Sequence, residues 1–351
     1  MTLLETLGID LPIIQAPMAG VSSPAMAVAV SNAGALGSIG VGATDARGAR
    51  AMIASVREHS TRSLNVNVFC HRPAKTDSAL EGAWLEYLRP HFERFDASPP
   101  PALKEIYRSF VEDDAMLAAL LEDKPRIVSF HFGLPSGDKI RALRAAGMVL
   151  LATATNVAEG HAVVKAGVHA VVAQGYEAGG HRGVFDPDLD DDCLGTMALT
   201  RLLVRQLDVP IIAAGGIMDG AGIAAALRLG AGAAQLGTAF IACPESHADA
   251  GYRVALAGDS ALHTVMTRAI SGRPARCLRN QFTLLGAGIL QRQIPGYPIA
   301  YDAGKALNTA AKAAHESGYG AQWAGQGAPL ARELPAAKLV AVLAEELKHS
   351  L

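Results

Sequence analysis

Glycines and a threonine at the ends of two hydrophobic runs could together bind a phosphate group. Residues 210–240 read PIIAAGGIMDGAGIAAALRLGAGAAQLGTAF. This pattern predicts a strand ending at Gly215 and Gly216, then a helix, then a strand ending at Gly237 and Thr238. Glycines there let backbone N–H groups approach an anion closely, and a following helix N-terminus adds positive charge. One Gly-Gly pair could be only a tight turn, but two successive strands ending in glycine favour a phosphate cradle.

Amide and imidazole side chains occur at the predicted carboxyl ends of further strands. The polar and glycine residues at these ends are Gln15 to Gly20, Asn67, His131, Gln174, Gly179 to His181, Gly215, Gly216 and Gln235 to Thr238. Amides donate to and accept from ring nitrogens and carbonyls, and glycines leave room for a ring. The set therefore suits a flat, polar heteroaromatic ring with a phosphate tail, and flavin mononucleotide (FMN) fits that description.

Two histidines and one cluster of hydroxyl and amine groups are candidates for substrate chemistry. His131 interrupts the apolar run VSFHF, where a histidine is often a satisfied core residue, but its place at a strand end favours a functional role. His181 lies in a glycine-rich loop and is interpreted either as a donor near the ring or as a surface residue. Tyr297, Tyr301 and Lys305 are spaced by four, so in a helix they share one face. Such a basic, hydroxyl-rich face would suit an anionic substrate.

Other polar residues are given less weight. His71 and Arg72 follow the third predicted strand and are interpreted as surface residues. The basic loop from Arg268 to Arg273 could border the mouth of the site or could be an ordinary surface loop. The acidic run from Asp186 to Asp192 matches no calcium loop and is interpreted as solvated. No metal site is predicted.

Eight strand patterns, almost all followed by helical patterns, must position these residues. The predicted strands are residues 11–15, 36–41, 64–70, 127–130, 149–152, 170–173, 210–214 and 233–236. Eight βα units predict an α/β protein with the (β/α)8 TIM-barrel fold, in which active-site residues lie at the carboxyl ends of strands. A six-stranded doubly wound sheet is the alternative, but it leaves two apolar segments unpaired, and no G-x-G-x-x-G follows the first strand.

The surplus length defines two insertions. The FMN-binding barrel is predicted over residues 1–241 and 328–351, with a helical insertion at 71–125. A smaller helical domain, inserted after the last strand and lying over one mouth of the barrel, is predicted over residues 242–327. The amphipathic helix at residues 335–348 is expected to close the barrel.

Composition indicates an ordinary globular protein. The chain has 351 residues, is 50% hydrophobic and 18% charged, and has a net charge of −2, which suggests no nucleic-acid or acidic-membrane partner. The start has no signal-peptide pattern, and no apolar run approaches the roughly 18 residues that span a bilayer. We therefore expect a cytoplasmic protein, as a monomer or homodimer.

Six motifs in order along nearly the whole chain resemble the nitronate monooxygenase family, formerly called 2-nitropropane dioxygenases. They are QAPMAG from Gln15, NVNVF from Asn65, SFHFG from Ser129, QGYEAGGHRG from Gln174, AAGGI from Ala213 and QLGTAF from Gln235. The segment PIAYDAGKALN from Pro298 is similar to the class I branch, which oxidises propionate 3-nitronate. The resemblance implies an FMN-dependent barrel with a helical substrate-binding domain, which would be residues 242–327. It also implies an enzyme that uses O2 to convert alkyl nitronates to a carbonyl compound and nitrite or nitrate.

The resemblance also assigns residues. It implies that Gly216 and the turn at residues 235–238 hold the FMN phosphate, that His131 is the active-site histidine, and that Tyr297, Tyr301 and Lys305 line the substrate pocket. His181 is grouped with the substrate-binding residues. The residues expected to bind the cofactor are Met18, Ala19, Gly20, Asn67, Gln174, Gly179, Gly180, Gly215, Gly216, Gln235, Leu236, Gly237 and Thr238.

Three other functions remain open from the sequence. An FMN-dependent NADH:quinone reductase and a flavin-dependent enoyl-acyl-carrier reductase would use the same cofactor. A non-catalytic phosphate-binding barrel would use only the glycine cradle, but it would not need amide side chains at three strand ends.

Overall fold

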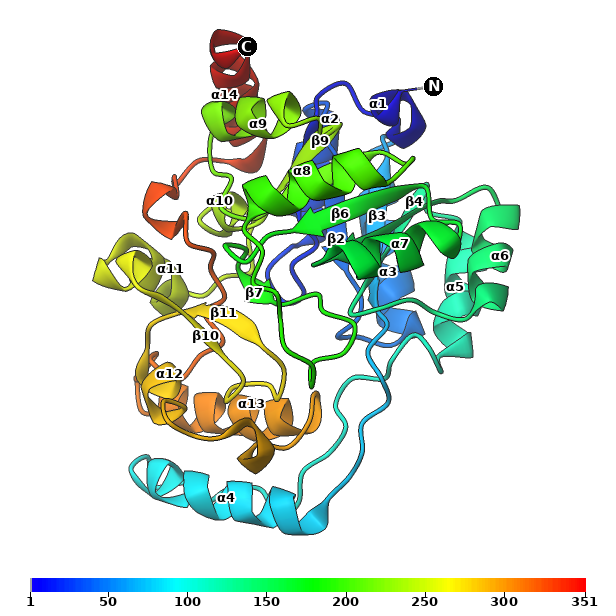
Figure 1. Cartoon of the computed structure of the whole chain (residues 1–351). Helices are drawn as coiled ribbons and strands as arrows, with labels where there is room; N and C mark the ends of the chain where they lie inside the picture. Colours follow the sequence, from blue (N-terminus) through cyan, green and yellow to red (C-terminus); the bar gives the residue numbers. More distant parts are fainter. Residues whose placement is uncertain (1) are drawn as a thin grey trace.

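The computed structural model describes residues 2–351 and contains a closed barrel of eight parallel strands (Figure 1). The strands are β1 (Ile13–Gln15), β2 (Gly37–Gly40), β3 (Leu64–Phe69), β4 (Ile127–His131), β5 (Val149–Ala154), β6 (Ala170–Gln174), β8 (Ile211–Ala214) and β9 (Ala233–Leu236). Their order is β1-β9-β8-β6-β5-β4-β3-β2. The ring closes between β1 and β2, where the Gln15 N–H donates to the Leu36 carbonyl over 2.9 Å. The predicted TIM barrel is confirmed, and the doubly wound sheet is excluded.

Helices cover the outside of the barrel. They are α2 (Pro24–Asn32), α3 (Ala46–Arg57), α5 (Asp114–Asp123), α6 (Gly137–Ala145), α7 (Val157–Lys165), α8 (Thr196–Gln206), α9 (Gly220–Arg228) and α14 (Ala336–Ser350). Side-chain caps at Ser23, Asp45 and Asp219 each accept a backbone N–H of the first turn, which explains where those helices begin. The last helix, α14, packs against α9 and α2 and completes the outer ring, as the sequence predicted. A short α1 (Leu3–Leu7) precedes β1, and a four-residue α10 (Thr238–Ile241) follows β9.

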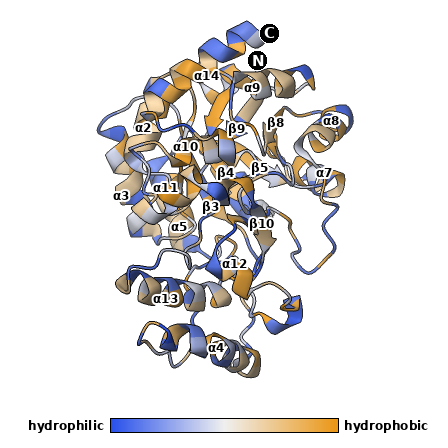
Figure 2. Cartoon of the chain, turned by 90° about the vertical axis from the view of Figure 1, so that its left-hand side faces the viewer, coloured by the Kyte–Doolittle hydropathy of each residue, from blue (hydrophilic) through white to orange (hydrophobic). Residues whose placement is uncertain are grey.

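Hydropathy follows this layering. Figure 2 shows hydrophobic colour on β9 and alternating hydrophobic and hydrophilic colours along α14. Such a pattern is typical of a strand buried on both faces and of a helix with one buried side. No helix within residues 2–351 is long and apolar enough to cross a membrane.

A smaller body lies at one end of the barrel. Its helices are α11 (Ala250–Ala257), α12 (Gln281–Leu285) and α13 (Ile299–Ala313), with 3-10 turns η1 (Asp259–Leu262), η2 (Gln291–Gln293) and η3 (Ala328–Leu330). The helix α4 (Ser78–Glu93), from the first insertion, lies beside α13 and shares a hydrophobic cluster with it (Figure 1). The division of the chain into two domains with the predicted bounds remains a proposal.

The smaller body also contains strands that the sequence did not predict. Strands β10 (Thr264–Thr267) and β11 (Ala275–Leu278) form an antiparallel sheet whose third strand, β7 (Gly180–His181), comes from the loop after β6. His181 pairs with Ala275 in this sheet. The loop after β6 therefore joins the barrel to the smaller body, and it places His181 at that junction.

Candidate active site

The carboxyl ends of the barrel strands open into a cavity of about 540 Å³. Barrel loops line one side, and the smaller body supplies Tyr252, Tyr297, Tyr301, Lys305 and Trp323 on the other. The predicted site residues that line this cavity are Met18, Ala19, Gly20, Asn67, His131, Gln174, Gly179, Gly180, His181, Gly215, Gly216, Gln235, Gly237, Thr238, Tyr297, Tyr301 and Lys305. Leu236 does not line it. Its side chain is 1% exposed and packs in the hydrophobic cluster outside the strands, because alternate strand residues face opposite ways.

The glycine cradle has the backbone conformation that only glycine adopts easily. Gly215 and Gly216 have φ values of +126° and +70°. A second glycine segment, missed from the sequence, faces them: a Cβ on Gly179 would lie 2.4 Å from the Gly325 nitrogen. The Gly325 N–H donates to the Thr238 hydroxyl over 2.9 Å. The glycines of QWAGQG at residues 322–327 are the signal that could have revealed this second wall.

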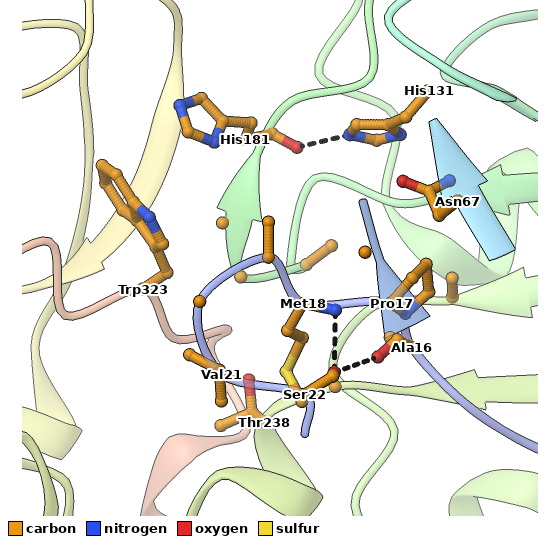
Figure 3. Close-up of a pocket in the computed structure, with 18 of the residues that line it drawn as sticks. Ala16, Pro17, Met18, Val21, Ser22, Asn67, His131, His181, Thr238 and Trp323 are labelled. Carbon is orange, nitrogen blue, oxygen red and sulfur yellow. Dashed lines mark hydrogen bonds between the residues drawn. The ribbon is translucent and has the colours of Figure 1, made fainter. Parts of the chain in front are cut away.

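The exit loop of β1 is fixed by one serine. The Ser22 hydroxyl accepts the Met18 N–H over 2.9 Å and donates to the Ala16 carbonyl over 3.1 Å, as Figure 3 shows. The Gln15 amide donates to the same hydroxyl over 2.8 Å and accepts the Ser38 N–H over 2.9 Å. Met18, Ala19 and Gly20 are thereby held at the cavity wall, and Ser22 is a site residue that sequence analysis missed.

Asn67 offers an acceptor to the cavity. Its amide NH2 donates to the Ser129 carbonyl over 3.1 Å and to the Ser129 hydroxyl over 2.9 Å. These two bonds set the amide orientation, so the carbonyl oxygen of Asn67 faces the cavity side in Figure 3. Gln235 lines the cavity with no hydrogen bond to its side chain within residues 2–351, so its amide is available to a ligand.

His131 is fully engaged by the protein. Burial lowers the pKa of His131 to about 4, so the ring is neutral at pH 7. Its Nε2 lies 3.2 Å from the His181 carbonyl oxygen, which can only accept, so Nε2 carries the proton. Its Nδ1, 2.9 Å from Thr153 Oγ1, then accepts from that hydroxyl. The Gln174 amide donates to the same His181 carbonyl over 3.0 Å, so two residues hold this backbone in place.

The His181 ring lies between two aromatic rings. Its Nε2 is 2.9 Å from Ser271 Oγ, and its centroid is 5.0 Å from that of Trp323 and 5.3 Å from that of Tyr297. Burial, with the positive charge of Arg273 next, holds the pKa of His181 well below its usual value. Figure 3 shows the rings of His181 and His131 across one end of the cavity, joined through the His181 carbonyl. The structure thus places His181 at the site rather than on the surface.

The hydroxyl groups and the amine gather at the cavity mouth. Tyr301 and Lys305 lie on α13, whereas Tyr297 comes just before its first residue, so only two of the three share the helix. The Lys305 ammonium donates to the Tyr107 hydroxyl over 2.6 Å and lies 5.0 Å from the centre of that ring. Tyr107 comes from the first insertion and was missed, because no regular pattern surrounds it. We call Tyr107, Tyr297, Tyr301 and Lys305 the mouth cluster.

One interpretation from the sequence is wrong, and one open choice is settled. His71 is 1% exposed rather than on the surface, because the chain after β3 turns inward beneath Tyr297, whose ring is 4.9 Å from the His71 ring. Arg72 is exposed, as expected, and pairs with Asp186 over 2.8 Å. In the basic loop Arg273 is buried, with 2% exposure, and Ser271 contacts the His181 ring, so this loop lies against the residues that line the cavity.

The residues present can hold a flat ring with a phosphate tail. A Cβ on the glycines that face each other across the cradle would fill the space between them. The Asn67 carbonyl oxygen and the Gln235 amide have no partner among the residues described, so both are available to a ligand. Within residues 2–351, no three His, Cys, Asp or Glu side chains gather in a way that could hold a metal ion.

Comparisons with known proteins agree along the whole chain. The model of the family described as nitronate monooxygenase matches residues 1–346. A protein named nitronate monooxygenase from Paraburkholderia phytofirmans is 64% identical over 99% of this chain and 95% of its own length. One of the same name from Pseudomonas aeruginosa is 56% identical over 97% of each chain.

Solved structures show the same fold. A nitroalkane oxidase from Streptomyces ansochromogenes superposes with a TM-score of 0.90 at 41% identity, over 99% of this chain and 98% of the other. FabK from Thermotoga maritima superposes with a TM-score of 0.74 at 29% identity, over 99% of this chain and 96% of the other.

Proposed function

The chain belongs to the nitronate monooxygenase family, and from this premise we propose that it is an FMN-dependent enzyme that oxidises alkyl nitronates with O2. Propionate 3-nitronate is the proposed type of substrate, and a carbonyl compound with nitrite or nitrate the proposed products. The charge of the cavity carries this proposal. Among its lining residues no Asp or Glu occurs, and Lys305 is the one side chain with a full charge. An anionic substrate fits such a cavity, and a cationic one does not.

FMN fits the cradle and the amides already described. Gly216 and residues 235–238 would hold its phosphate, and Asn67, Gln174 and Gln235 would border its ring. When bound, FMN would supply the redox chemistry by accepting electrons from the substrate and delivering them to O2.

The chain's own groups are suited to a substrate that needs no deprotonation. A nitronate carbon is already carbanion-like, so the two neutral histidines serve as hydrogen-bond partners rather than as strong bases. His181, whose Nδ1 forms no hydrogen bond within residues 2–351, would hold the nitronate group in place near the ring, and His131 would fix the backbone of His181. If a neutral nitroalkane is bound, His181 is the one of these two histidines with a ring nitrogen free to take its proton.

The mouth cluster would bind the far end of a carboxylated nitronate. The Lys305 ammonium provides the charge, and the Tyr297 hydroxyl, buried with no hydrogen-bond partner in residues 2–351, provides a free donor. A buried hydroxyl without a partner costs free energy, so a substrate oxygen that accepts from it would bind favourably.

An absorbance spectrum of the purified protein, followed by anaerobic mixing with propionate 3-nitronate or with NADH, tests the proposal. A yellow protein that is reduced by the nitronate but not by NADH supports it. Reduction by NADH alone would favour a quinone or enoyl-acyl-carrier reductase. A protein that takes up no flavin would overturn the cofactor assignment.

A further inference from the structure

Arg273 is a buried cation with no anionic partner. It lies in the loop between β10 and β11 and is 2% exposed. Within residues 2–351 its guanidinium forms no salt bridge, whereas the equally buried Arg182 nearby pairs with Asp191 over 2.7 Å. Burying an unpaired charge is costly, and replacing such a charge by an apolar side chain often stabilises a protein. Packing alone therefore does not account for an arginine at this position.

The protein holds this guanidinium directly behind the cavity wall. Arg273 donates to the carbonyls of Val184 and Arg182, which follow His181 in the loop after β6. The guanidinium carbon Cζ of Arg273 lies 4.2 Å from the centre of the Phe132 ring, and Phe132 lines the cavity. The positive charge is thus separated from the cavity by one aromatic ring.

Phe132 is the centre of the histidine cluster. Its ring centroid lies 4.4 Å from that of His131, 5.6 Å from that of His181 and 6.4 Å from that of His71. Phe132 has φ of +73°, a left-handed conformation that is strained for a bulky residue. This strained conformation places the Phe132 ring in contact with Arg273 on one side and with the three histidines on others.

We propose that Arg273 is an electrostatic positioning residue whose charge, unpaired and held behind Phe132, makes the cavity attractive to anions and opposes a second positive charge on the three histidines around Phe132. The inference rests on the proposed function in that the anion would be the nitronate. Arg273 does not touch the substrate, and it acts through the field that it sets up in the cavity.

Within residues 2–351, no carboxylate lies close enough to Arg273 to form an ion pair with it, although three act on it from farther away. The titratable groups around the cluster and around Arg273 come from several elements: His71 after β3, His131 on β4, Glu159 on α7, His181 on β7, Arg182, Asp186 and Asp188 in the following loop, Arg268 in the basic loop, and Tyr107, Tyr297, Tyr301 and Lys305 at the mouth. Glu159 and Asp188 act on Arg273 in the opposite sense, but neither forms an ion pair with it, and Glu159 accepts instead from the Thr155 N–H and hydroxyl and from the Phe185 N–H. After burial itself, the charge of Arg273 contributes to the lowered pKa of each of the three histidines.

The test measures histidine titration in the holoenzyme, separately from turnover. We would follow the ring signals of labelled histidines by NMR against pH in wild type, Arg273→Met, Arg273→Lys and the control Arg268→Gln. Arg268 lies five residues earlier in the same loop and donates to the Pro187 carbonyl, away from the cavity lining. Arg273→Met removes the charge and fills its space with an apolar side chain. It also takes a donor away from the Val184 and Arg182 carbonyls, and Arg273→Lys, which changes the same hydrogen bonds but keeps the charge, controls for that loss.

Arg273→Met should raise the titration midpoints of the cavity histidines by about one pH unit, while Arg273→Lys and Arg268→Gln leave them near the wild-type values. It should also raise KM for an anionic nitronate by about tenfold, without lowering the melting temperature. Unchanged midpoints in Arg273→Met would overturn the proposal. So would equal shifts in Arg273→Lys, since the hydrogen bonds and not the charge would then be responsible.

The two proposals fail in different ways. If wild type oxidises no nitronate but the histidine midpoints shift as expected, the proposed substrate is wrong and the role of Arg273 in setting the histidine charge stands. If nitronate is oxidised and the midpoints do not move, the role of Arg273 is wrong and the proposed function stands.

Discussion

His131 holds the backbone of His181: the Nε2 of one lies 3.2 Å from the carbonyl oxygen of the other. Since both ring nitrogens of His131 are already bonded, its first task is to fix the strand β7 on which His181 lies. The histidine that the sequence singled out as catalytic thus also positions a second histidine, and substitutions at the two positions should not behave independently.

Shortening the side chain of His131 should disturb this arrangement without emptying the cofactor site. His131→Asn cannot reach the His181 carbonyl, so we expect kcat/KM for propionate 3-nitronate to fall about 100-fold while bound flavin stays at the wild-type ratio. Steady-state kinetics and the flavin-to-protein absorbance ratio measure the two effects. Thr153→Val, which removes only the hydroxyl that faces Nδ1, serves as a milder control. Wild-type turnover in His131→Asn would exclude His131 from the mechanism.

The mouth cluster should select for substrates with a second negative charge. Lys305→Met removes the ammonium that donates to Tyr107, so KM for propionate 3-nitronate should rise about tenfold, while ethyl nitronate, which has no carboxylate, should be nearly unaffected. Lys305→Arg keeps the charge and should retain most of the selectivity. An equal loss with both substrates would mean that Lys305 does not bind the carboxylate.

Filling the glycine cradle should release the flavin. In Gly216→Ala the added Cβ would lie 3.3 Å from the Glu177 Cβ, and φ of +70° would be strained for alanine. We expect the flavin content after purification to fall severalfold. Gly82→Ala in α4, where a Cβ meets nothing within 4 Å, is the matched control and should retain its flavin. Full flavin content in Gly216→Ala would place the phosphate elsewhere.

The barrel could be predicted because its strands carry their own pattern. Apolar runs such as Ile211–Ala214 are buried on both faces, and a glycine or polar residue marks each carboxyl end. The number of barrel strands and the barrel side of the cavity lining therefore follow largely from local sequence. The strands β10 and β11 could not be predicted in this way. They are four residues long, and they form only because β7 arrives from a loop some 90 residues earlier.

The positions of side chains that depend on tertiary packing could not be predicted from the local sequence. His71 and Arg273 have polar identities that predict exposure, yet both lie behind the cavity wall. Tyr107 reaches Lys305 only because the first insertion folds back over α13. These are contacts between segments that lie from 89 residues apart, for Arg273 and Val184, to 198 residues apart, for Lys305 and Tyr107, and no local periodicity predicts them.

The buried histidines should make stability fall as the pH drops below 6.5. Burial lowers the pKa of His71 and of His131 to about 4, below the value of about 6.5 in the unfolded chain. Between these values the unfolded state binds more protons than the folded state, so stabilisation present above pH 6.5 is lost progressively toward pH 4. For one such histidine the loss between pH 7 and pH 5 is about 2 kcal/mol.

His71→Leu isolates one of these contributions. Both ring nitrogens of His71 lack a hydrogen-bond partner within residues 2–351, so an apolar side chain of similar size leaves no other group unpaired. At pH 7 we expect urea unfolding to give nearly equal free energies of unfolding for the variant and for wild type. At pH 5 we expect the variant to be more stable than wild type by about 2 kcal/mol. His161→Leu, at an exposed position of α7, is the control and should follow the wild-type pH dependence. If His71→Leu and wild type lose the same stability between pH 7 and pH 5, His71 does not couple folding to proton binding. Removing a group that does so would have reduced the pH dependence of the free energy of unfolding.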